Sequence, residues 1–232
     1  MDHAPVFPGA RQGLFITLEG VEGSGKTTQI PRLAEFLESR GMECVRTREP
    51  GGTAIGARLR AVLLDPGNHH LHPLCELLLY EADRVQHVAE VIVPNLSAGR
   101  AVVCDRFFDA TTVYQGYARR LSRERIQDLH DWLFAGLVPD LTLIFDLPAE
   151  VGLSRARARL ADDGTGEGRF EEEQLKFHER VRAGYLDLAR ENPGRFRVVD
   201  ADAAPEKVAG RMTSAVAAFL DARAAVLSEK VG

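Results

Sequence analysis

The stretch GVEGSGKT, residues 20–27, constrains the fold of this chain more than any other. It satisfies the pattern G-x-x-x-x-G-K-[ST], follows the apolar run 14–18 and precedes a helical pattern that begins at Lys26. In that context the backbone amides of a glycine-rich loop converge on phosphate oxygens at the positive end of a helix. The stretch therefore predicts a phosphate-binding loop, called the Walker loop below, between a buried strand and a helix.

Further apolar, β-branched runs alternate with longer helical patterns along the chain. Short runs that are almost continuously apolar favour parallel strands buried on both faces. We expect strands at 14–18, 43–47, 101–105, 141–146 and 195–200, and helices at 26–39, 54–64, 74–98, 123–137, 148–160, 170–190 and after Pro205. The alternation predicts a three-layer α/β fold, with a five-stranded parallel sheet between helices and right-handed crossovers.

The 232 residues contain no recognisable linker, so we expect one domain, 1–232. Residues 1–12 lack the basic-then-apolar order of a signal peptide and are predicted to form a loose tail. The polar, glycine-rich stretch 161–169 lies between arginine-bearing helices. It is either a plain surface loop or part of a short mobile lid at about 155–172. Pro31 falls inside the first predicted helix, where we expect a bend.

Composition restricts the classes of partner. The net charge of −5 disfavours nucleic-acid binding, which usually needs a basic surface. No apolar run approaches the roughly 20 residues of a membrane span. The three cysteines are odd in number and form no CxxC pair, and two of them lie in apolar runs, which favours buried, reduced thiols and a cytoplasmic location.

The stretch AVVCDRF places Asp105 at the end of a predicted strand, directly before Arg106. An acid in this position can hold Mg²⁺, usually through water, and the adjacent arginine suits a site with two phosphate groups. A turn or a helix cap is the alternative reading of such an aspartate. Lys26 would reach the β and γ phosphates of ATP, and the Thr27 hydroxyl would ligate Mg²⁺. No NKxD-like stretch is present, which disfavours a GTPase.

Several motifs together make the chain resemble the thymidylate kinases, over about residues 14–219. They are EGVEGSGKTT (19–28), TREPGGT (47–53), YEADRVQH (80–87), DRFFDATTVYQG (105–116), and PDLTLIFDLPAEVGLSRARAR (139–159) followed by RFEEE (169–173). The Walker loop alone occurs in many activities, whereas REPGGT together with DR…YQG is much more specific. The resemblance implies a P-loop nucleoside monophosphate kinase fold and Mg²⁺-dependent phosphorylation of dTMP by ATP, giving dTDP for dTTP synthesis. It also implies a homodimer, through helices such as 74–98.

The resemblance also assigns residues to the two substrates. For ATP they are Gly20, Val21, Glu22, Gly23, Ser24, Gly25, Lys26, Thr27 and Thr28. For dTMP they are Glu22, Arg60, Tyr80, Arg84, Arg106, Thr111 and Gln115.

Within the dTMP set, Tyr80 would stack on the pyrimidine and Arg84 would hydrogen-bond it, since an aromatic face and one guanidinium fork fix a flat base. Two further arginines, at 60 and 106, would hold the acceptor phosphate, while Thr111 and Gln115 would complete the base pocket. Glu22 would contact the 3′-hydroxyl of the acceptor sugar or a nearby arginine. The alternatives are a core aromatic at 80 and a solvated loop acid at 22. Where the family commonly has a first hydroxyl residue after DR, this chain has Ala110.

Some thymidylate kinases carry a catalytic arginine in the phosphate loop, but this loop reads VEGS and has none. The chain therefore resembles the bacterial type, whose lid supplies the arginine. Arg155, Arg159 and Arg169 are the candidates, with Arg169 the first choice. Such an arginine stabilises charge on the transferring phosphoryl group and contributes about 10³–10⁵ in rate in related chemistry. The expected catalytic set is Lys26, Asp105, Arg106, Arg159 and Arg169.

Two other functions are compatible with the Walker loop. The chain could phosphorylate a different small acceptor, such as another pyrimidine nucleotide or a nucleoside. Alternatively, it could be an ATPase switch that binds a protein partner and transfers nothing. The motifs YEADR and DATTVYQG argue against the switch, because a switch needs no second small-molecule pocket.

Overall fold

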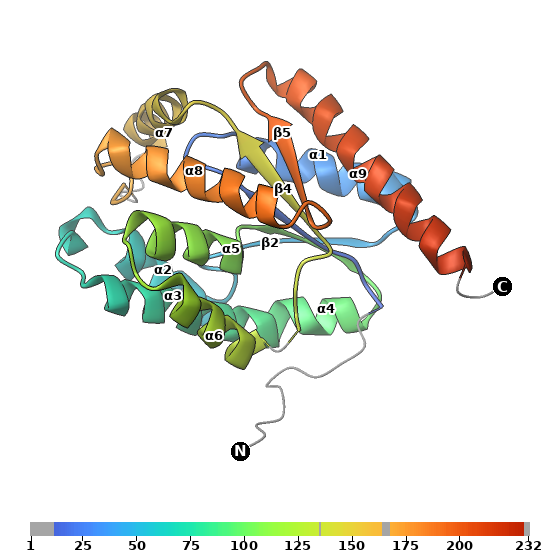
Figure 1. Cartoon of the computed structure of the whole chain (residues 1–232), viewed down its shortest axis with the longest axis horizontal. Helices are drawn as coiled ribbons and strands as arrows, with labels where there is room; N and C mark the ends of the chain where they lie inside the picture. Colours follow the sequence, from blue (N-terminus) through green and yellow to red (C-terminus); the bar gives the residue numbers. More distant parts are fainter. Residues whose placement is uncertain (1–11, 135, 164–167, 230–232) are drawn as a thin grey trace.

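The computed structural model describes residues 12–134, 136–163 and 168–229. Five parallel strands form its centre: β1 (Phe15–Glu19), β2 (Cys44–Arg48), β3 (Ala101–Asp105), β4 (Leu141–Asp146) and β5 (Phe196–Asp200). Their order across the sheet is β2-β3-β1-β4-β5, with β1 in the middle (Figure 1). The predicted five-stranded parallel sheet is confirmed, and each strand lies within one residue of its expected bounds. The predicted tail, as far as residue 11, and lid residues 164–167 lie outside the described residues.

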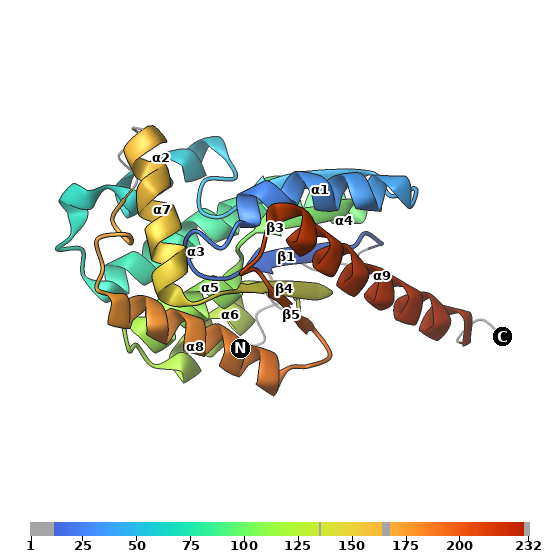
Figure 2. The ribbon, with the colours of Figure 1, turned by 90° about the horizontal axis from the view of Figure 1, so that it is seen from above.

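Helices cover both faces of the sheet (Figures 1 and 2). One face packs against α1 (Lys26–Ser39) and α9 (Pro205–Glu229), and the other against α3 (Pro73–His87), α4 (Val93–Ser97), α6 (Arg123–Phe134) and α8 (Leu175–Glu191). Leu14, Ile16 and Leu18 of the central run point toward α1 and α9, whereas Phe15 points toward α4 and α6, as the period-two alternation of a strand requires. The apolar runs therefore make a three-layer core.

The prediction that every strand is buried on both faces is wrong for β2 and β5. β1 and most of β3 and β4 are buried, but β2 is half-buried to exposed along its length and β5 alternates between buried and more exposed positions. These two strands are the edges of the sheet, so each has a neighbour on one side only. Similarly, of the three cysteines only Cys104 is buried; Cys44 is half-buried and Cys75 is exposed.

Some helices differ from their expected bounds. The stretch 74–98 forms α3 and α4 joined by the π-helical turn η2 (Val88–Ile92). This turn ends two residues before Pro94, whose missing N–H disrupts regular α-helical bonding. The predicted helix 170–190 begins only at Leu175. Two further elements, α5 (Phe108–Thr111) and the π-helical η3 (Thr112–Ala118), are not among the helices predicted from sequence. Helix α1 continues through Pro31.

The remaining elements gather at the carboxyl ends of the strands. Helix α2 (Ala54–Leu64) packs against α3, with the short 3₁₀ turn η1 (Pro66–Asn68) after it, and α7 (Ala149–Asp163) packs against α8. Figure 2 shows α2 and α7 at the end of the sheet where the Walker loop enters α1. Ligands in open α/β sheets bind at this edge. Among the described residues, none of the helices combines the length and apolar character needed to cross a bilayer.

Candidate active site

The Walker loop is held in place by close backbone packing against α7. Gly23 has φ +68°, and a Cβ built on it would lie 2.0 Å from the carbonyl oxygen of Gly152. A Cβ on Gly152 would in turn lie 2.5 Å from the carbonyl oxygen of Glu22. Only glycine fits at both positions, so α7 fixes the loop from outside the motif. Gly152 is not among the site residues predicted from sequence, where its signal is a glycine within a helical pattern.

Lys26 is the first residue of α1, and its side chain is buried beneath the Walker loop. Its Nζ donates hydrogen bonds to the carbonyl oxygens of Gly20 and Val21, both at 3.0 Å, and to Ser24 Oγ at 3.1 Å. Burial and the positive charge of Arg106 lower the pKa of Lys26 to about 8. An anionic ligand beside the ammonium group would oppose both effects, so the site is built to favour phosphate.

Arg106 follows the end of β3 and has a left-handed backbone, with φ 69°. Its guanidinium donates to Glu22 Oε1 at 3.2 Å and to the Tyr185 hydroxyl at 3.0 Å, and it lies 4.9 Å from the centre of the Tyr114 ring. Glu22 also accepts a short hydrogen bond from the Tyr114 hydroxyl and pairs with His178 Nδ1 at 3.1 Å. Of its two predicted contacts, Glu22 makes the one to a nearby arginine, and the one to a sugar remains a prediction.

Behind Arg106 lies Glu19, a fully buried acid at the end of β1. It accepts hydrogen bonds from the Phe107 backbone N–H at 2.8 Å and from the Tyr185 hydroxyl at 2.6 Å. Burial outweighs the charge of Arg106 and raises the pKa of Glu19 to about 7. Glu19, His178 and Tyr185 are not among the site residues predicted from sequence. The spacing of seven residues between His178 and Tyr185, which puts both on one face of α8, was the available signal.

The environment of Glu22 leads to a prediction about stability. Burial would raise the pKa of Glu22, but the His178 hydrogen bond and the Arg106 charge lower it from 4.5 to about 2. The ionised carboxylate therefore stabilises the fold above pH 4.5, and this contribution is lost as pH falls toward 2. Glu22→Gln is expected to lower the free energy of unfolding at pH 7 by up to about 3 kcal/mol, with a deficit that shrinks below pH 4.5. Urea unfolding across pH measures this.

The exposed Glu172, which makes no comparable contacts, supplies the control for that series. Glu172→Gln is expected to change stability by less than about 0.5 kcal/mol at any pH. A Glu22→Gln deficit that stayed constant between pH 7 and pH 3 would contradict the assignment.

A single cavity of about 1300 Å³ connects the Walker loop to a second wall. Most of the predicted site residues line it: Glu22, Gly23, Ser24, Gly25, Lys26, Thr27, Thr28, Arg60, Tyr80, Asp105, Arg106, Thr111, Gln115 and Arg159. The second wall carries Tyr80 from α3, with Thr111 and Gln115 from the helical segment that follows Arg106. Gly20 and Val21 do not line the cavity; instead, their carbonyl groups hold Lys26.

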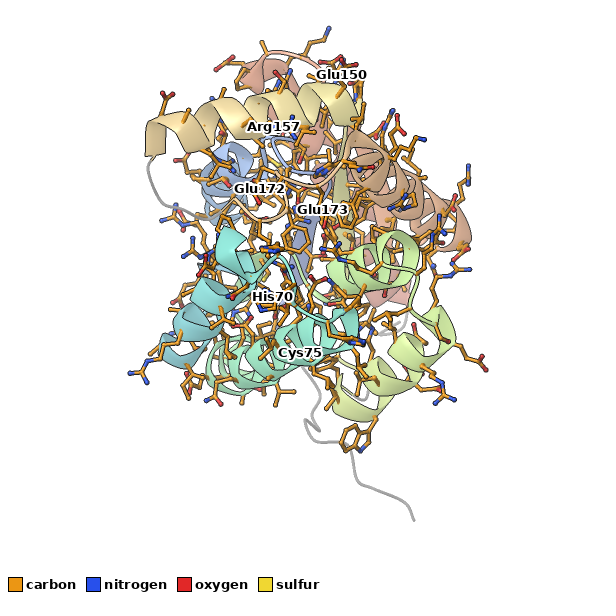
Figure 3. The ribbon with its side chains drawn as sticks, turned by 90° about the vertical axis from the view of Figure 1, so that its left-hand side faces the viewer. His70, Cys75, Glu150, Arg157, Glu172 and Glu173 are labelled. Atoms are coloured by element: carbon orange, nitrogen blue, oxygen red, sulfur yellow. The ribbon has the colours of Figure 1, made fainter. Side chains whose placement is uncertain are left out.

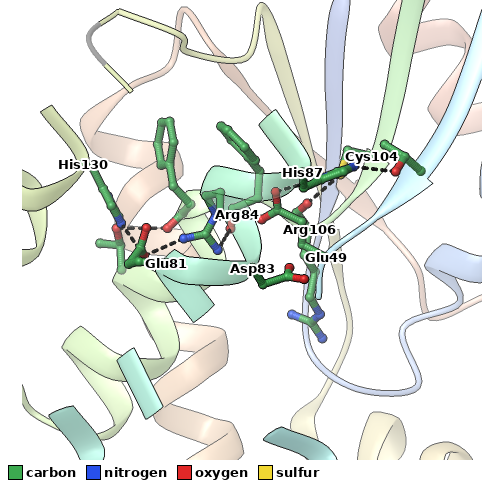
Figure 4. Close-up of polar contacts among 12 residues, drawn as sticks. Glu49, Glu81, Asp83, Arg84, His87, Cys104, Arg106 and His130 are labelled. Atoms are coloured by element: carbon green, nitrogen blue, oxygen red, sulfur yellow. Dashed lines mark hydrogen bonds and ion pairs between the residues drawn. The ribbon is translucent and has the colours of Figure 1, made fainter. Parts of the chain in front are cut away.

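Arg84 lies behind the cavity rather than on its wall. Its Nε donates to Glu49 Oε2 at 2.6 Å, Nη1 to Glu81 Oε1 at 2.5 Å, and Nη2 to the Phe107 carbonyl at 3.3 Å. Figure 4 shows the guanidinium between Glu81 on one side and Glu49 on the other, with His130 and His87 beyond them. Such a buried, paired cation fixes the elements around it. The contact between Arg84 and a pyrimidine remains a prediction, and the burial of Arg84 between two acids does not favour it.

The three candidate lid arginines lie in different places. Arg155 and Arg159 on α7 line the cavity, whereas Arg169 is buried and donates to Glu76 Oε2 at 2.7 Å and to the Leu63 carbonyl at 2.5 Å. Figure 3 shows Glu172 and Glu173, which follow Arg169 along the chain, between Arg157 of α7 and Cys75 at the start of α3. The structure therefore brings Arg159, and not Arg169, to the same cavity as Lys26.

The carboxyl end of β3 offers a place for Mg²⁺. Asp105 Oδ1 is buried and has no hydrogen-bond partner among the described residues, and Thr27 lines the same cavity. Within the described ranges, no group of three or more His, Cys, Asp or Glu side chains could hold a metal ion by itself. Mg²⁺ usually keeps several waters and binds through one or two carboxylates together with substrate phosphates. Asp105 and Thr27 fit that kind of site.

Comparisons with known proteins agree with this geometry. A sequence model of the family described as thymidylate kinase matches residues 18–211. A thymidylate kinase of Desulfosudis oleivorans is 57% identical over 205 residues, which cover 88% of this chain and 96% of the relative. One of Desulforapulum autotrophicum is 56% identical over 88% of this chain and 90% of its own length. One of Desulfovibrio desulfuricans is 51% identical over 90% and 98%, respectively. With its Walker loop, its second wall and these relatives, the chain belongs to the thymidylate kinase family.

Proposed function

We propose that the Walker loop binds ATP, that the wall with Tyr80, Thr111 and Gln115 binds dTMP, and that Arg106 lies between the two substrates. As a member of its family, the chain phosphorylates dTMP to dTDP with ATP as the phosphoryl donor. The observation that supports the placement is the single cavity that connects the Walker loop to the second wall. A site for one phosphate ligand has no need of a second wall with an aromatic ring, a hydroxyl and an amide.

Transfer needs positioning and charge neutralisation rather than a strong base, because the acceptor phosphate oxygen is already anionic. Lys26 and Arg106 place positive charge at the Walker loop, and Glu22 orients Arg106 from the side. Arg155 and Arg159 add positive charge from α7. Exclusion of water by a lid would make transfer prevail over hydrolysis.

We propose Asp105 and Thr27 as the residues that hold Mg²⁺ when nucleotide is bound. The buried, unpartnered Oδ1 of Asp105 supports this. The ion would neutralise charge on the ATP phosphates. Asp105→Asn is therefore expected to raise the Mg²⁺ concentration needed for half-maximal activity, as a magnesium titration would measure.

An acceptor panel tests the proposed acceptor. ADP release is measured with ATP and dTMP, dUMP, dCMP, dGMP or thymidine, and dTMP is expected to give the highest kcat/KM. A different acceptor at the top of the panel would favour the first alternative, another small-molecule kinase. ATP hydrolysis that is rapid and indifferent to dTMP would favour the ATPase switch.

Gly152 supplies a prediction about the donor site. Gly152→Ala places a methyl group 2.5 Å from the Glu22 carbonyl oxygen, so the Walker loop must shift. We expect the KM for ATP to rise about tenfold or more, with an overpacking cost of about 1–3 kcal/mol in stability. Initial rates at varied ATP measure the first effect. Gly210→Ala on α9, where a Cβ meets no atom within 4 Å, is the matched control and should leave KM unchanged. Equal KM values in the two variants would contradict the packing role.

We propose a homodimer that buries exposed apolar side chains of α2 and α3, two helices that pack against each other. They are Ile55, Val62, Leu74 and Leu78, each at least 44% exposed in the single chain. Sedimentation equilibrium is expected to give twice the chain mass, and Leu78→Asp should shift the protein toward monomer. A wild-type monomer at all concentrations would overturn this proposal.

The described cysteines are all free thiols, which supports a reducing, cytoplasmic location.

A further inference from the structure

Glu76 is a fully buried acid on α3, one turn before Tyr80, and it does not line the cavity. Its carboxylate joins three segments of the chain. Oε1 accepts from Gln115 Nε2 at 2.7 Å and from Arg119 Nε at 3.3 Å, while Oε2 accepts from Arg169 Nη1 at 2.7 Å and Arg119 Nη2 at 3.4 Å. Nothing in the mechanism above uses this carboxylate.

Its contact with Gln115 determines which way the amide of that side chain points. A carboxylate paired with two guanidinium groups only accepts hydrogen bonds, so the NH₂ end of Gln115 must face Glu76. The carbonyl end, Oε1, is therefore left for something else. Gln115 lines the cavity, and none of the described residues donates a hydrogen bond to its Oε1.

A second polar atom on the same wall also lacks a partner. Thr111 Oγ1 is buried and has no hydrogen bond within the described part of the chain. Thr111 and Gln115 are four residues apart in one helical segment, and both line the cavity with Tyr80. Buried polar atoms are nearly always hydrogen-bonded, so the unpartnered Thr111 hydroxyl points to a ligand edge that carries hydrogen-bonding atoms. The carbonyl end of Gln115 is available to the same edge, because Gln115 lines the cavity and its NH₂ end is held by Glu76.

The fixed direction of the Gln115 amide can distinguish pyrimidines. Thymine and uracil carry an N3–H donor, whereas N3 of cytosine is an acceptor and its C4 amino group is a donor. A carbonyl fixed toward N3 accepts from the N3–H of thymine but faces the lone pair of cytosine. The Thr111 hydroxyl rotates and can donate or accept, so it does not discriminate in this way.

We propose that Glu76 is a specificity-determining positioning residue: it holds the Gln115 amide with its carbonyl toward the acceptor base, and so favours pyrimidines with an N3–H over 4-aminopyrimidines. This rests on the proposed placement of dTMP at the Tyr80 wall. Discrimination arises because the wrong base leaves two acceptors facing each other in a buried site.

The test compares kcat/KM for dTMP and dCMP in a double-mutant cycle. Glu76→Gln lets the amide of Gln115 turn, because the new side chain can both donate and accept. The dTMP/dCMP ratio of kcat/KM is expected to fall about tenfold or more. In a Gln115→Leu background, which lacks the amide, adding Glu76→Gln should change the ratio by less than about twofold.

Glu173→Gln is the matched control. Glu173 is the other carboxylate that pairs with Arg119, but it does not contact Gln115, so its loss should leave the ratio unchanged. A merely structural role of Glu76 would lower kcat/KM for both nucleotides in parallel and keep the ratio. That outcome would overturn the proposal.

Gln115→Leu alone covers the case in which Glu76→Gln does not fold. It leaves Glu76 and its arginines in place, and the ratio should again fall about tenfold; an unchanged ratio would overturn the inference. The wild-type acceptor panel distinguishes failure of the proposed function from failure of the role proposed for Glu76. If the wild type does not phosphorylate dTMP, the proposed function itself fails. If it prefers dTMP but both variants retain that preference, only the role of Glu76 is wrong.

Discussion

Replacing Lys26 with methionine is expected to lower kcat by about 10²–10³-fold, the loss typical of removing one preorganised group that stabilises transition-state charge. The nucleotide-free variant should nevertheless be at least as thermally stable as the wild type at pH 7. The ammonium group is buried and its pKa is lowered to about 8, so at pH 7 the fold bears the cost of a desolvated charge. Methionine fills a similar volume without that charge.

The sign of the pH dependence follows from the same shift. The folded-state pKa of Lys26 lies below its ordinary 10.5, so the destabilisation is complete below pH 8 and disappears as pH rises to 10.5. The stability difference between Lys26→Met and wild type should therefore narrow over that window. Thermal melts with and without ATP, together with steady-state rates, measure both effects. Lys176→Met, at an exposed position on α8, is the control; a Lys26→Met enzyme with near-normal kcat would contradict the assignment.

In the lid, Arg159→Ala is expected to lower kcat by about 10³-fold with a much smaller change in the KM for dTMP. Its side chain is 52% exposed and belongs to the cavity that contains Lys26. Arg169 was the first choice from sequence, but to reach a phosphoryl group it would have to leave Glu76 and the Leu63 carbonyl. Arg169→Ala should therefore lower stability and impair dTMP binding, because Glu76 loses a partner.

Single-turnover rates and the KM for dTMP in both variants decide between the two arginines. Arg157→Ala is a control on the same helix, since Arg157 binds the Glu171 carbonyl and does not line the cavity; its kcat should fall far less. A large loss of kcat in Arg169→Ala, with Arg159→Ala near wild type, would restore the sequence-based choice. It would also require the lid to release Arg169 during turnover.

The parts of the site that sequence could predict are those determined by local pattern. The Walker loop, the end of β3 and the wall with Thr111 and Gln115 each lie in one short segment, next to a strand or helix with clear periodicity. Parallel topology then predicts that these segments lie close together in space, because the carboxyl ends of adjacent strands meet at one edge of the sheet. The register confirms this: Leu18 of β1 pairs with Asp105 of β3.

The parts that sequence could not predict depend on contacts between distant segments. Nothing local distinguishes Arg84, which is buried between two acids, from an arginine that faces a ligand. Gly152 matters only because the Walker loop packs on it from 130 residues earlier in the chain. Glu76 reads as a helix-surface acid until the fold brings Gln115 and Arg169 to it. The edge positions of β2 and β5 are likewise a property of strand order and not of the strands themselves.

The backbone of Arg106 has an evolutionary consequence. A non-glycine residue in the left-handed region costs about 1–3 kcal/mol, and at this position the cost is incurred directly beside the Walker loop. Glycine would relieve it but would remove the guanidinium that Glu22, Tyr114 and Tyr185 surround. The relief is offset in part by the lost pairing with Glu22, so selection for heat resistance alone would tolerate several residues at position 106, whereas selection for turnover would retain arginine. Laboratory evolution of a thermostable variant should retain arginine there only while catalysis is also under selection.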